Sequence, residues 1–176
     1  SFTVYDDDDA VNLLKEAAPE LDKKSLTVAA REISLAKDYF LFPEDDLSFI
    51  TESRSRDVDF DLNTVYKKYQ NRLQATGNAD FGDLIMLPAK IMEENQAIKN
   101  YIRNRFEIIM VDEYQDSNIA QYRLLQTLSG VNENSGNYVC VVGDDDQSIY
   151  HFRGAEVQNI LSFPDKFPGT QIIRLE

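Results

Sequence analysis

The hydrophobic pattern of the chain changes at Phe106, and this change restricts the folds that the chain can adopt. Up to that residue, apolar residues recur every three or four positions, which is the spacing of one face of an α-helix. After it come short, largely apolar runs at Ile108–Val111, Tyr138–Val142 and Gln171–Leu175. Short apolar runs between helices are typical of strands buried on both faces of a parallel sheet. The sequence therefore predicts an α/β fold, with a helical region followed by a β-α-β-α-β unit of the doubly wound kind.

Capping and breaking residues predict where the helices begin and end. Pro43 should end the second helix, residues 44–60 should form a loop, and Pro88 should kink the helix that contains it. The acidic run Asp6–Asp9 should cap a helix; a calcium site is the alternative, but the run lacks the alternating spacing of a calcium loop. Further helix starts are expected at Ser25 and Asp80, and further helices over 62–73, 96–104, 119–128 and 155–162.

Composition excludes several classes of protein. With one cysteine, the chain can form neither an internal disulfide nor a cysteine-based metal cage. Cys140 lies inside an expected strand, so packing is favoured over a reactive thiol. No apolar run approaches the ~18 residues of a membrane span, so we expect a cytoplasmic protein without a membrane partner. The net charge of −13 opposes long-range attraction to nucleic acid, and composition alone argues against such a partner.

Two acidic residues follow the first expected strand. Asp112 and Glu113 come directly after Ile108–Val111, and ligands of open parallel sheets bind beyond the carboxyl ends of the strands. An aspartate there can hold the magnesium ion of a nucleoside triphosphate, and a glutamate beside it can deprotonate the attacking water. The alternative is a polar strand end at which two acids only meet solvent.

A second polar cluster, Gly143–Tyr150, follows the next expected strand. Within it, the amide of Gln147 could both donate and accept hydrogen bonds near a γ-phosphate or its water. Tyr150, Phe152 and Arg153 could stack on and clamp single-stranded bases. The alternative is that the two rings are core packing and that Arg153 pairs with a nearby acid.

Taken together, the two clusters carry a family resemblance. VDEYQDSN at 111–118 and VVGDDDQSIYHFRGA at 141–155 resemble motifs II and III of superfamily 1 DNA helicases of the UvrD/Rep family. FTVYDDDDAVNLLKE near the start resembles the opening of the family's helical 1B insertion, and ADFGDLI at 79–85 resembles its DFDDL helix. The resemblance implies a helical 1B-like subdomain over 1–78 and part of a RecA-like P-loop NTPase domain, 1A, over 79–176.

The resemblance also implies roles for the acidic cluster. Asp112 would coordinate Mg²⁺, and Glu113 would be the catalytic base for ATP hydrolysis. Gln115 and Asp116 would support the nucleotide site. Gln147 would act in catalysis by coupling the γ-phosphate of ATP to the DNA site.

The DNA-facing roles implied by the resemblance fall on three residues. Tyr150 and Phe152 would face single-stranded DNA, and Arg153 would connect the DNA side to the nucleotide cleft. Phe152 stands where the family more often has tryptophan, which leaves less area for stacking. The only histidine, His151, is expected at the surface.

The implied function is that of an ATP-dependent DNA helicase. Such an enzyme couples Mg-ATP hydrolysis to 3′–5′ movement on single-stranded DNA, acts at junctions of single and double strands, and could meet repair or replication proteins. The 176 residues contain no GxxxxGK[ST] phosphate loop, so the chain resembles a fragment and should be inactive alone. The alternatives are a non-enzymatic DNA- or protein-interaction module and an unrelated acidic metal-binding protein.

Overall fold

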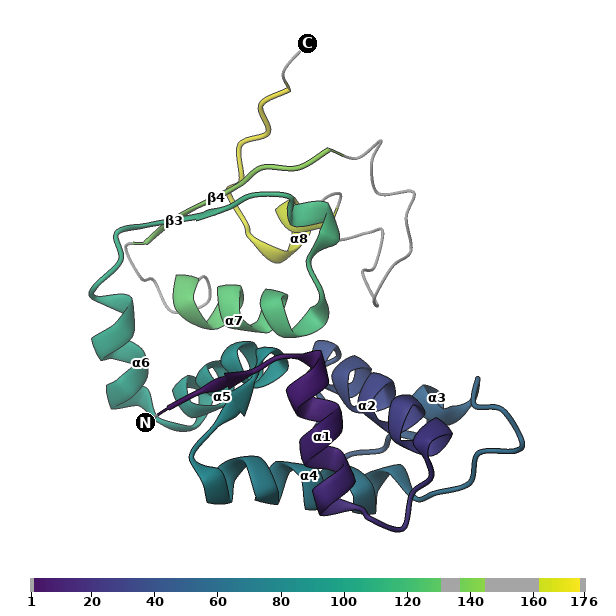
Figure 1. Cartoon of the computed structure of the whole chain (residues 1–176). Coiled ribbons are helices and arrows are strands. Elements are labelled where there is room, and N and C mark those ends of the chain that lie inside the picture. The colour runs from purple at the N-terminus through teal and green to yellow at the C-terminus, as the bar shows by residue number, and fades with distance from the viewer. Residues whose placement is uncertain (1, 131–136, 145–161, 175–176) are drawn as a thin grey trace. The chain divides into compact units, whose positions relative to one another are not determined.

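The computed structural model of the chain describes residues 2–130, 137–144 and 162–174 (Figure 1). The chain divides into two compact units, Ser1–Pro88 and Ala89–Glu176, and each unit has its own buried cluster. Helices dominate unit 1, and unit 2 contains parallel strands, so the predicted α/β class is confirmed. None of the helices in these described ranges has the length and apolar character needed to cross a membrane.

Unit 1 is built around three long helices. The first, second and fourth helices pack against one another, and two short strands pair in parallel beside them. The elements, of which the last continues into unit 2, are β1 (Val4–Tyr5), α1 (Asp7–Ala17), α2 (Lys23–Asp38), α3 (Ser48–Thr51), α4 (Leu62–Thr76), β2 (Ala79–Asp80) and α5 (Phe81–Glu94).

Acidic residues start α1 and α5, as expected. Asp6 caps α1 through a capping box in which the Asp9 N–H donates to Asp6 Oδ1 at 2.9 Å. This confirms the predicted capping role. Asp80 Oδ1 likewise accepts the Asp83 N–H at 2.9 Å at the start of α5.

Ser25 was the wrong choice for the cap of the second helix. Asp22 caps α2 instead, because its Oδ1 accepts the Ser25 N–H at 2.7 Å. This hydrogen bond holds the pKa of the Asp22 carboxyl below its usual value. The helix ends at Asp38, before Pro43, and the expected loop over 44–60 contains the one-turn helix α3.

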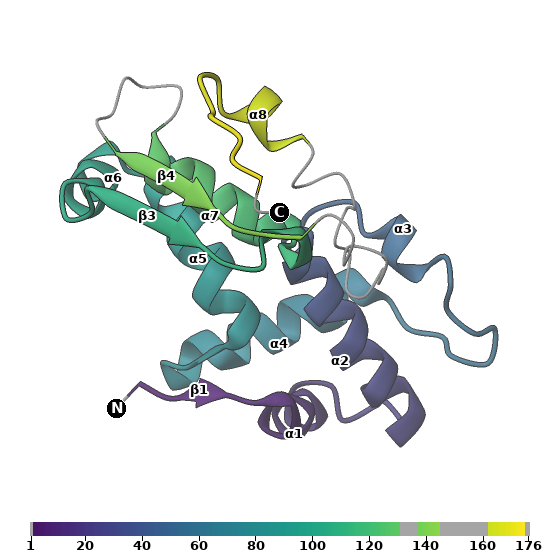
Figure 2. The ribbon, with the colours of Figure 1, turned by 90° about the horizontal axis from the view of Figure 1, so that it is seen from above.

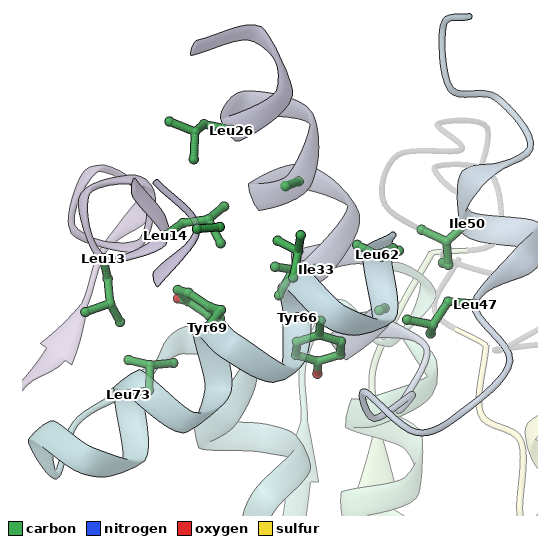
Figure 3. Close-up of a cluster of buried hydrophobic side chains, with 14 residues drawn as sticks. Leu13, Leu14, Leu26, Ile33, Leu47, Ile50, Leu62, Tyr66, Tyr69 and Leu73 are labelled. Carbon is green, nitrogen blue, oxygen red and sulfur yellow. The ribbon is translucent and has the colours of Figure 1, made fainter. Parts of the chain in front are cut away.

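The core of unit 1 consists of apolar side chains from these helices (Figure 3). Periodicity in α4 places every third or fourth residue inward, and the helix ends at Gly77, whose φ of 69° suits glycine. The labelled core residues are Leu13, Leu14, Leu26, Ile33, Leu47, Ile50, Leu62, Tyr66, Tyr69 and Leu73.

A buried ion cluster lies beside this core. Lys37 Nζ on α2 is 2.6 Å from Asp80 Oδ2 and 2.8 Å from Asp83 Oδ1, and the Lys37 side chain is only 1% exposed. The Tyr69 hydroxyl donates to Asp80 Oδ2 at 2.9 Å. A Cβ on Gly82 would lie 2.7 Å from Lys37 Cδ, so the chain needs glycine at this close approach.

Unit 2 combines a two-stranded parallel sheet with short helices on one face. Beyond the end of α5, its elements are α6 (Gln96–Arg103), β3 (Ile108–Val111), the 3₁₀ turn η1 (Tyr114–Asp116), α7 (Ile119–Ser129), β4 (Tyr138–Val141) and α8 (Phe163–Lys166). Figure 2 shows β3 and β4 side by side. The predicted strand over 108–111 and the predicted helices over 96–104 and 119–128 are confirmed.

One face of this sheet is packed and the other is exposed. The packed side chains come from the sheet, η1, α7 and the region of α8: Ile109, Val111, Tyr114, Tyr122, Leu125, Val139, Val141, Phe163 and Phe167. The opposite face includes Met110, which is 72% exposed, and the exposed thiol of Cys140. The expectations of strands buried on both faces and of a packed Cys140 were therefore wrong, because the described residues cover only one side.

The third expected strand is also absent from the described part of the chain. Residues 171–174 form no strand and pair with neither β3 nor β4. A strand needs a neighbour for its backbone hydrogen bonds, and none of the described segments supplies one here. The expected helix over 155–162 lies almost entirely outside the described residues.

Candidate functional site

The candidate site lies at the carboxyl ends of β3 and β4. The two strands pair in register from Ile108 with Tyr138 to Val111 with Val141, so both end at the same edge. The pairing continues through two hydrogen bonds, from Val142 N–H to Val111 O at 2.8 Å and from Tyr114 N–H to Val142 O at 2.9 Å. The two polar clusters of the sequence therefore begin next to each other.

The backbone turns sharply at the acidic pair. Glu113 has φ 48° and ψ 42°, a left-handed conformation that is uncommon for a residue with a side chain. Its N–H donates to Asp112 Oδ1 at 3.0 Å, and its carbonyl accepts the Asp116 N–H at 2.9 Å, which closes η1. Asp112 and Glu113 are both exposed. This turn holds two adjacent carboxylates in solvent at the end of the β3–β4 pair.

Gln115 connects the acidic pair to the end of β4. Its Nε2 donates to Glu113 Oε2 at 2.6 Å, and its Oε1 accepts the Asp144 N–H at 3.1 Å. Gln115 is 3% exposed, so the middle of the bridge is buried although the Glu113 carboxylate at one end is exposed. The structure thus brings Asp112, Glu113, Gln115 and Asp144 to one edge of the sheet.

Tyr114 anchors the turn in the core of unit 2. Its ring is 1% exposed and contacts Phe163 edge-on, with centroids 5.3 Å apart. Burial raises the pKa of the Tyr114 hydroxyl to about 12. The buried hydroxyl oxygen has no hydrogen-bond partner among the residues that the structure describes. The turn is therefore fixed by ring packing rather than by the tyrosine hydroxyl.

A surface hollow of about 360 Å³ lies against the acidic turn. Asp112, Glu113 and Asp116 line one part of it, and α7 contributes Gln121 and Leu124. This contribution of α7 was not predicted, because the apolar spacing of the helix indicated only a packed element. The hollow gives a ligand of the carboxylates room beside the end of the sheet.

A comparison with protein families identifies the family of this chain. The model of the family described as UvrD/REP helicase N-terminal domain matches residues 1–168. The chain belongs to the UvrD/Rep helicase family. The resemblance stated from the two motif segments is thereby confirmed.

Individual relatives agree with this assignment. The chain is 39% identical to ATP-dependent DNA helicase UvrD1 of Mycobacterium bovis, with all of the chain and 24% of that protein covered. It is 36% identical to ATP-dependent DNA helicase Rep of Buchnera aphidicola subsp. Schizaphis graminum, with all of the chain and 26% of that protein covered. It is 38% identical to ATP-dependent DNA helicase PcrA of Staphylococcus epidermidis, with all of the chain and 24% of that protein covered. The chain spans about a quarter of the length of these relatives.

Four of the predicted UvrD/Rep site residues lie outside the described residues. These are Gln147, Tyr150, Phe152 and Arg153, and the same holds for His151. The other four, Asp112, Glu113, Gln115 and Asp116, lie together on the turn after β3. Their roles stay predictions, but their proximity agrees with a shared site.

The donor set at the turn suits magnesium better than a metal that needs a full protein cage. No cluster of three or more His, Cys, Asp or Glu side chains that could hold a metal ion occurs in the described ranges. Mg²⁺ usually keeps several waters and binds through one or two carboxylates together with substrate phosphates. The exposed Asp112 carboxylate fits that mode of binding.

Proposed function

We propose that this chain is part of an ATP-dependent DNA helicase that couples Mg-ATP hydrolysis to movement on single-stranded DNA and to duplex unwinding. The observation that carries the proposal is the exposed Asp112–Glu113 pair, fixed at the end of a parallel sheet in a chain of the UvrD/Rep helicase family. The proposed direction of movement is 3′–5′, and it rests on the family resemblance.

In this proposal Asp112 and Glu113 have different roles. Asp112 would hold Mg²⁺, which would neutralise charge on the phosphates of ATP when bound. Glu113 would accept a proton from the attacking water, and its exposed carboxylate beside the hollow is open to solvent. Asp116, which lines the same hollow, would support nucleotide binding.

The DNA side of the proposal rests on the second motif. Gln147 would couple the γ-phosphate to DNA, Tyr150 and Phe152 would stack on single-stranded bases, and Arg153 would connect the two sites. Support comes from the segment 141–155 and from the DNA helicases among the relatives. We further propose that the protein acts at junctions of single- and double-stranded DNA and that repair or replication proteins are its partners. Its proposed location is the cytoplasm.

We also propose that residues 1–78 form the 1B-like subdomain and 79–176 part of the RecA-like domain 1A. Support comes from the β1–β2 pairing, in which Tyr5 lies opposite Asp80. This pairing joins the beginning and the end of the helical region near residue 79. The division between the compact units comes later, after Pro88 inside α5, because the start of that helix packs with unit 1 through Lys37 and Asp83.

A second candidate applies to the segment taken by itself. The 176 residues lack a GxxxxGK[ST] loop, whose backbone amides and lysine would cradle the β- and γ-phosphates. On that observation we propose that the isolated segment does not turn over ATP and acts as a DNA- or protein-interaction module. Brisk ATP hydrolysis by the isolated segment would contradict this.

The test of the main proposal uses a full-length protein that contains this segment. Glu113→Gln should lower the rate of ATP hydrolysis in the presence of single-stranded DNA by at least about a hundredfold, because the base is lost. Binding of ATP, measured separately, should persist. Glu107→Gln is the matched control, because Glu107 is also exposed and lies just before β3.

The outcomes separate the parts of the proposal. Hydrolysis that single-stranded DNA does not stimulate in the wild-type protein would contradict the helicase proposal. Stimulated hydrolysis that survives in Glu113→Gln would contradict only the role given to Glu113.

A further inference from the structure

The side chain of Gln115 links the Glu113 carboxylate to the backbone that follows β4. It donates from Nε2 to Glu113 Oε2 at 2.6 Å and accepts at Oε1 from the Asp144 N–H at 3.1 Å. Gln115 itself is only 3% exposed. The carboxylate of the proposed base is thus tied to the backbone at Asp144, three residues beyond the end of β4.

The orientation of this amide is set by its partners. A carboxylate only accepts hydrogen bonds, and a backbone N–H only donates them. If the amide were flipped, its oxygen would face the Glu113 carboxylate and its NH₂ group would face the Asp144 N–H. Both contacts would be repulsive, so the observed orientation is the one that the site permits.

The backbone around Gln115 leaves the bridge little freedom. Residues Tyr114–Asp116 form the 3₁₀ turn, and the Tyr114 ring is buried against Phe163. The Tyr114 N–H also donates to Val142 O, which ties the turn to the chain just before Asp144. Only the exposed Glu113 side chain would be free to rotate if the amide were removed.

We infer that Gln115 is a positioning residue that holds the Glu113 carboxylate in its working orientation by bridging it to the Asp144 backbone. This inference rests on the proposed function, because it requires Glu113 to act as the base. Gln115 itself touches no reacting atom in this scheme. A base held by a fixed hydrogen bond needs no reorientation when substrate arrives, and misplacement by about 1 Å can cost about a hundredfold in rate.

Two substitutions separate positioning from a merely structural role. Gln115→Met keeps the length of the side chain but removes both hydrogen bonds. Gln115→Glu keeps the acceptor for the Asp144 N–H and replaces the donor that faces Glu113 with a second carboxylate. The same two changes at Gln74, whose side chain is exposed on α4, are matched controls.

The experiment measures kcat and the KM for ATP in a full-length protein that contains the segment. In Gln115→Met, kcat should fall by about ten- to a hundredfold, since the base loses its orientation. The KM for ATP should stay within about threefold, because the lost interaction serves the transition state. The Gln74 variants should match the wild type.

Gln115→Glu gives a second readout. Because a carboxylate at this position repels the Glu113 carboxylate instead of donating to it, kcat should fall at least as far as in Gln115→Met. The KM for ATP should again stay within about threefold, and this split between kcat and KM is the readout that a merely structural role would not give. Asp112 and Asp116, which line the hollow beside Glu113, are unchanged in every variant.

Each outcome decides the inference. A Gln115→Met protein with kcat within about threefold of wild type would overturn it, as would a Gln115→Glu protein that keeps the wild-type kcat. In both cases the proposed function would stand if the wild-type enzyme is stimulated by DNA. A wild-type protein without ATP hydrolysis would overturn both.

Discussion

The two units place charged side chains in opposite surroundings. In unit 1, Lys37 and Asp83 are each 1% exposed and lie 2.8 Å apart, inside a cluster that Asp80 and Tyr69 complete. In unit 2, the carboxylate of Glu113 is exposed at the end of a sheet whose outer face is exposed as well. A buried ion pair fixes one arrangement of helices, whereas an exposed carboxylate keeps its hydration and can meet a cation or a water. Carboxylates therefore serve stability in unit 1, whereas in the proposed function they serve reactivity in unit 2.

The largest expected effect is the loss of the buried cation. Lys37→Met removes the partner of one buried and one partly buried carboxylate and should lower the free energy of unfolding of unit 1 by about 3–5 kcal/mol. Denaturant-dependent hydrogen exchange of α2 and α4 would measure this change.

The matched control is Lys24→Met. Lys24 pairs with Asp57, but the side chains of both residues are more than half exposed. That substitution should change stability little. If the two variants were equally stable, the buried cluster would not hold unit 1 together.

A smaller effect compares a buried tyrosine from each unit. The Tyr66 hydroxyl donates to Leu41 O at 3.1 Å, so Tyr66→Phe should cost about 1 kcal/mol in unit 1. The buried Tyr114 hydroxyl has no partner among the described residues, so Tyr114→Phe should leave unit 2 equally or slightly more stable. Chemical denaturation with a probe in each unit would measure both. Because phenylalanine keeps the ring, a clear loss of stability in Tyr114→Phe would mean that the hydroxyl also holds the turn.

The smallest effect concerns acid stability of a helix start in unit 1. Hydrogen bonds from Thr64, chiefly from its hydroxyl, hold the pKa of the Asp61 carboxyl below its ordinary value of 3.8. A lowered pKa in the folded state gives stability that is present above pH 3.8 and is lost as the pH falls through the lower, folded value. Since asparagine also caps helices, Asp61→Asn should match the wild type near neutral pH and lose less stability in acid.

This effect should stay below about 1 kcal/mol, because solvent screens an exposed carboxylate. Unfolding free energies at about pH 6 and about pH 3 would show it as a smaller acid loss in the variant. Equal losses in the two proteins would mean that Asp61 contributes nothing to acid unfolding.

The spacing of apolar residues predicted most of the helices and strands. The features that it did not predict depend on how strands pair with and pack against other segments. Apolar spacing located α4, and a continuous apolar run located β3, because burial repeats along one face of each element. Whether a strand is covered depends on other segments, so the exposed Cys140 and the unpaired residues 171–174 could not be read from their own sequence. The choice of Asp22 over Ser25 as a cap was decided by local geometry, since both residues are good caps.

The candidate site was predictable in its location but not in its internal contacts. Because neighbouring parallel strands end at the same edge of a sheet, the residues after β3 and β4 were expected to meet there. The location of the acidic pair follows from this. The bridge from Gln115 to Asp144 depends on the left-handed backbone at Glu113, which turns the next side chains toward the end of β4. Nothing in the residue types signals such a conformation in advance.

The pairing of β1 with β2 has a consequence for how this part of the chain could change over time. Val4 lies opposite Ala79, and the Thr3 N–H donates to Asn78 Oδ1 at 3.1 Å across 75 residues. The chain thus enters and leaves the helical region at adjacent parallel strands, and the helices between these strands form a segment whose two ends lie next to each other. Segments whose entry and exit adjoin are the ones that a host fold gains, loses or exchanges with the least disturbance. Helices α1–α4 form such a segment, and besides the two short strands it is the ion pair of Lys37 with Asp83 that an exchange would have to preserve.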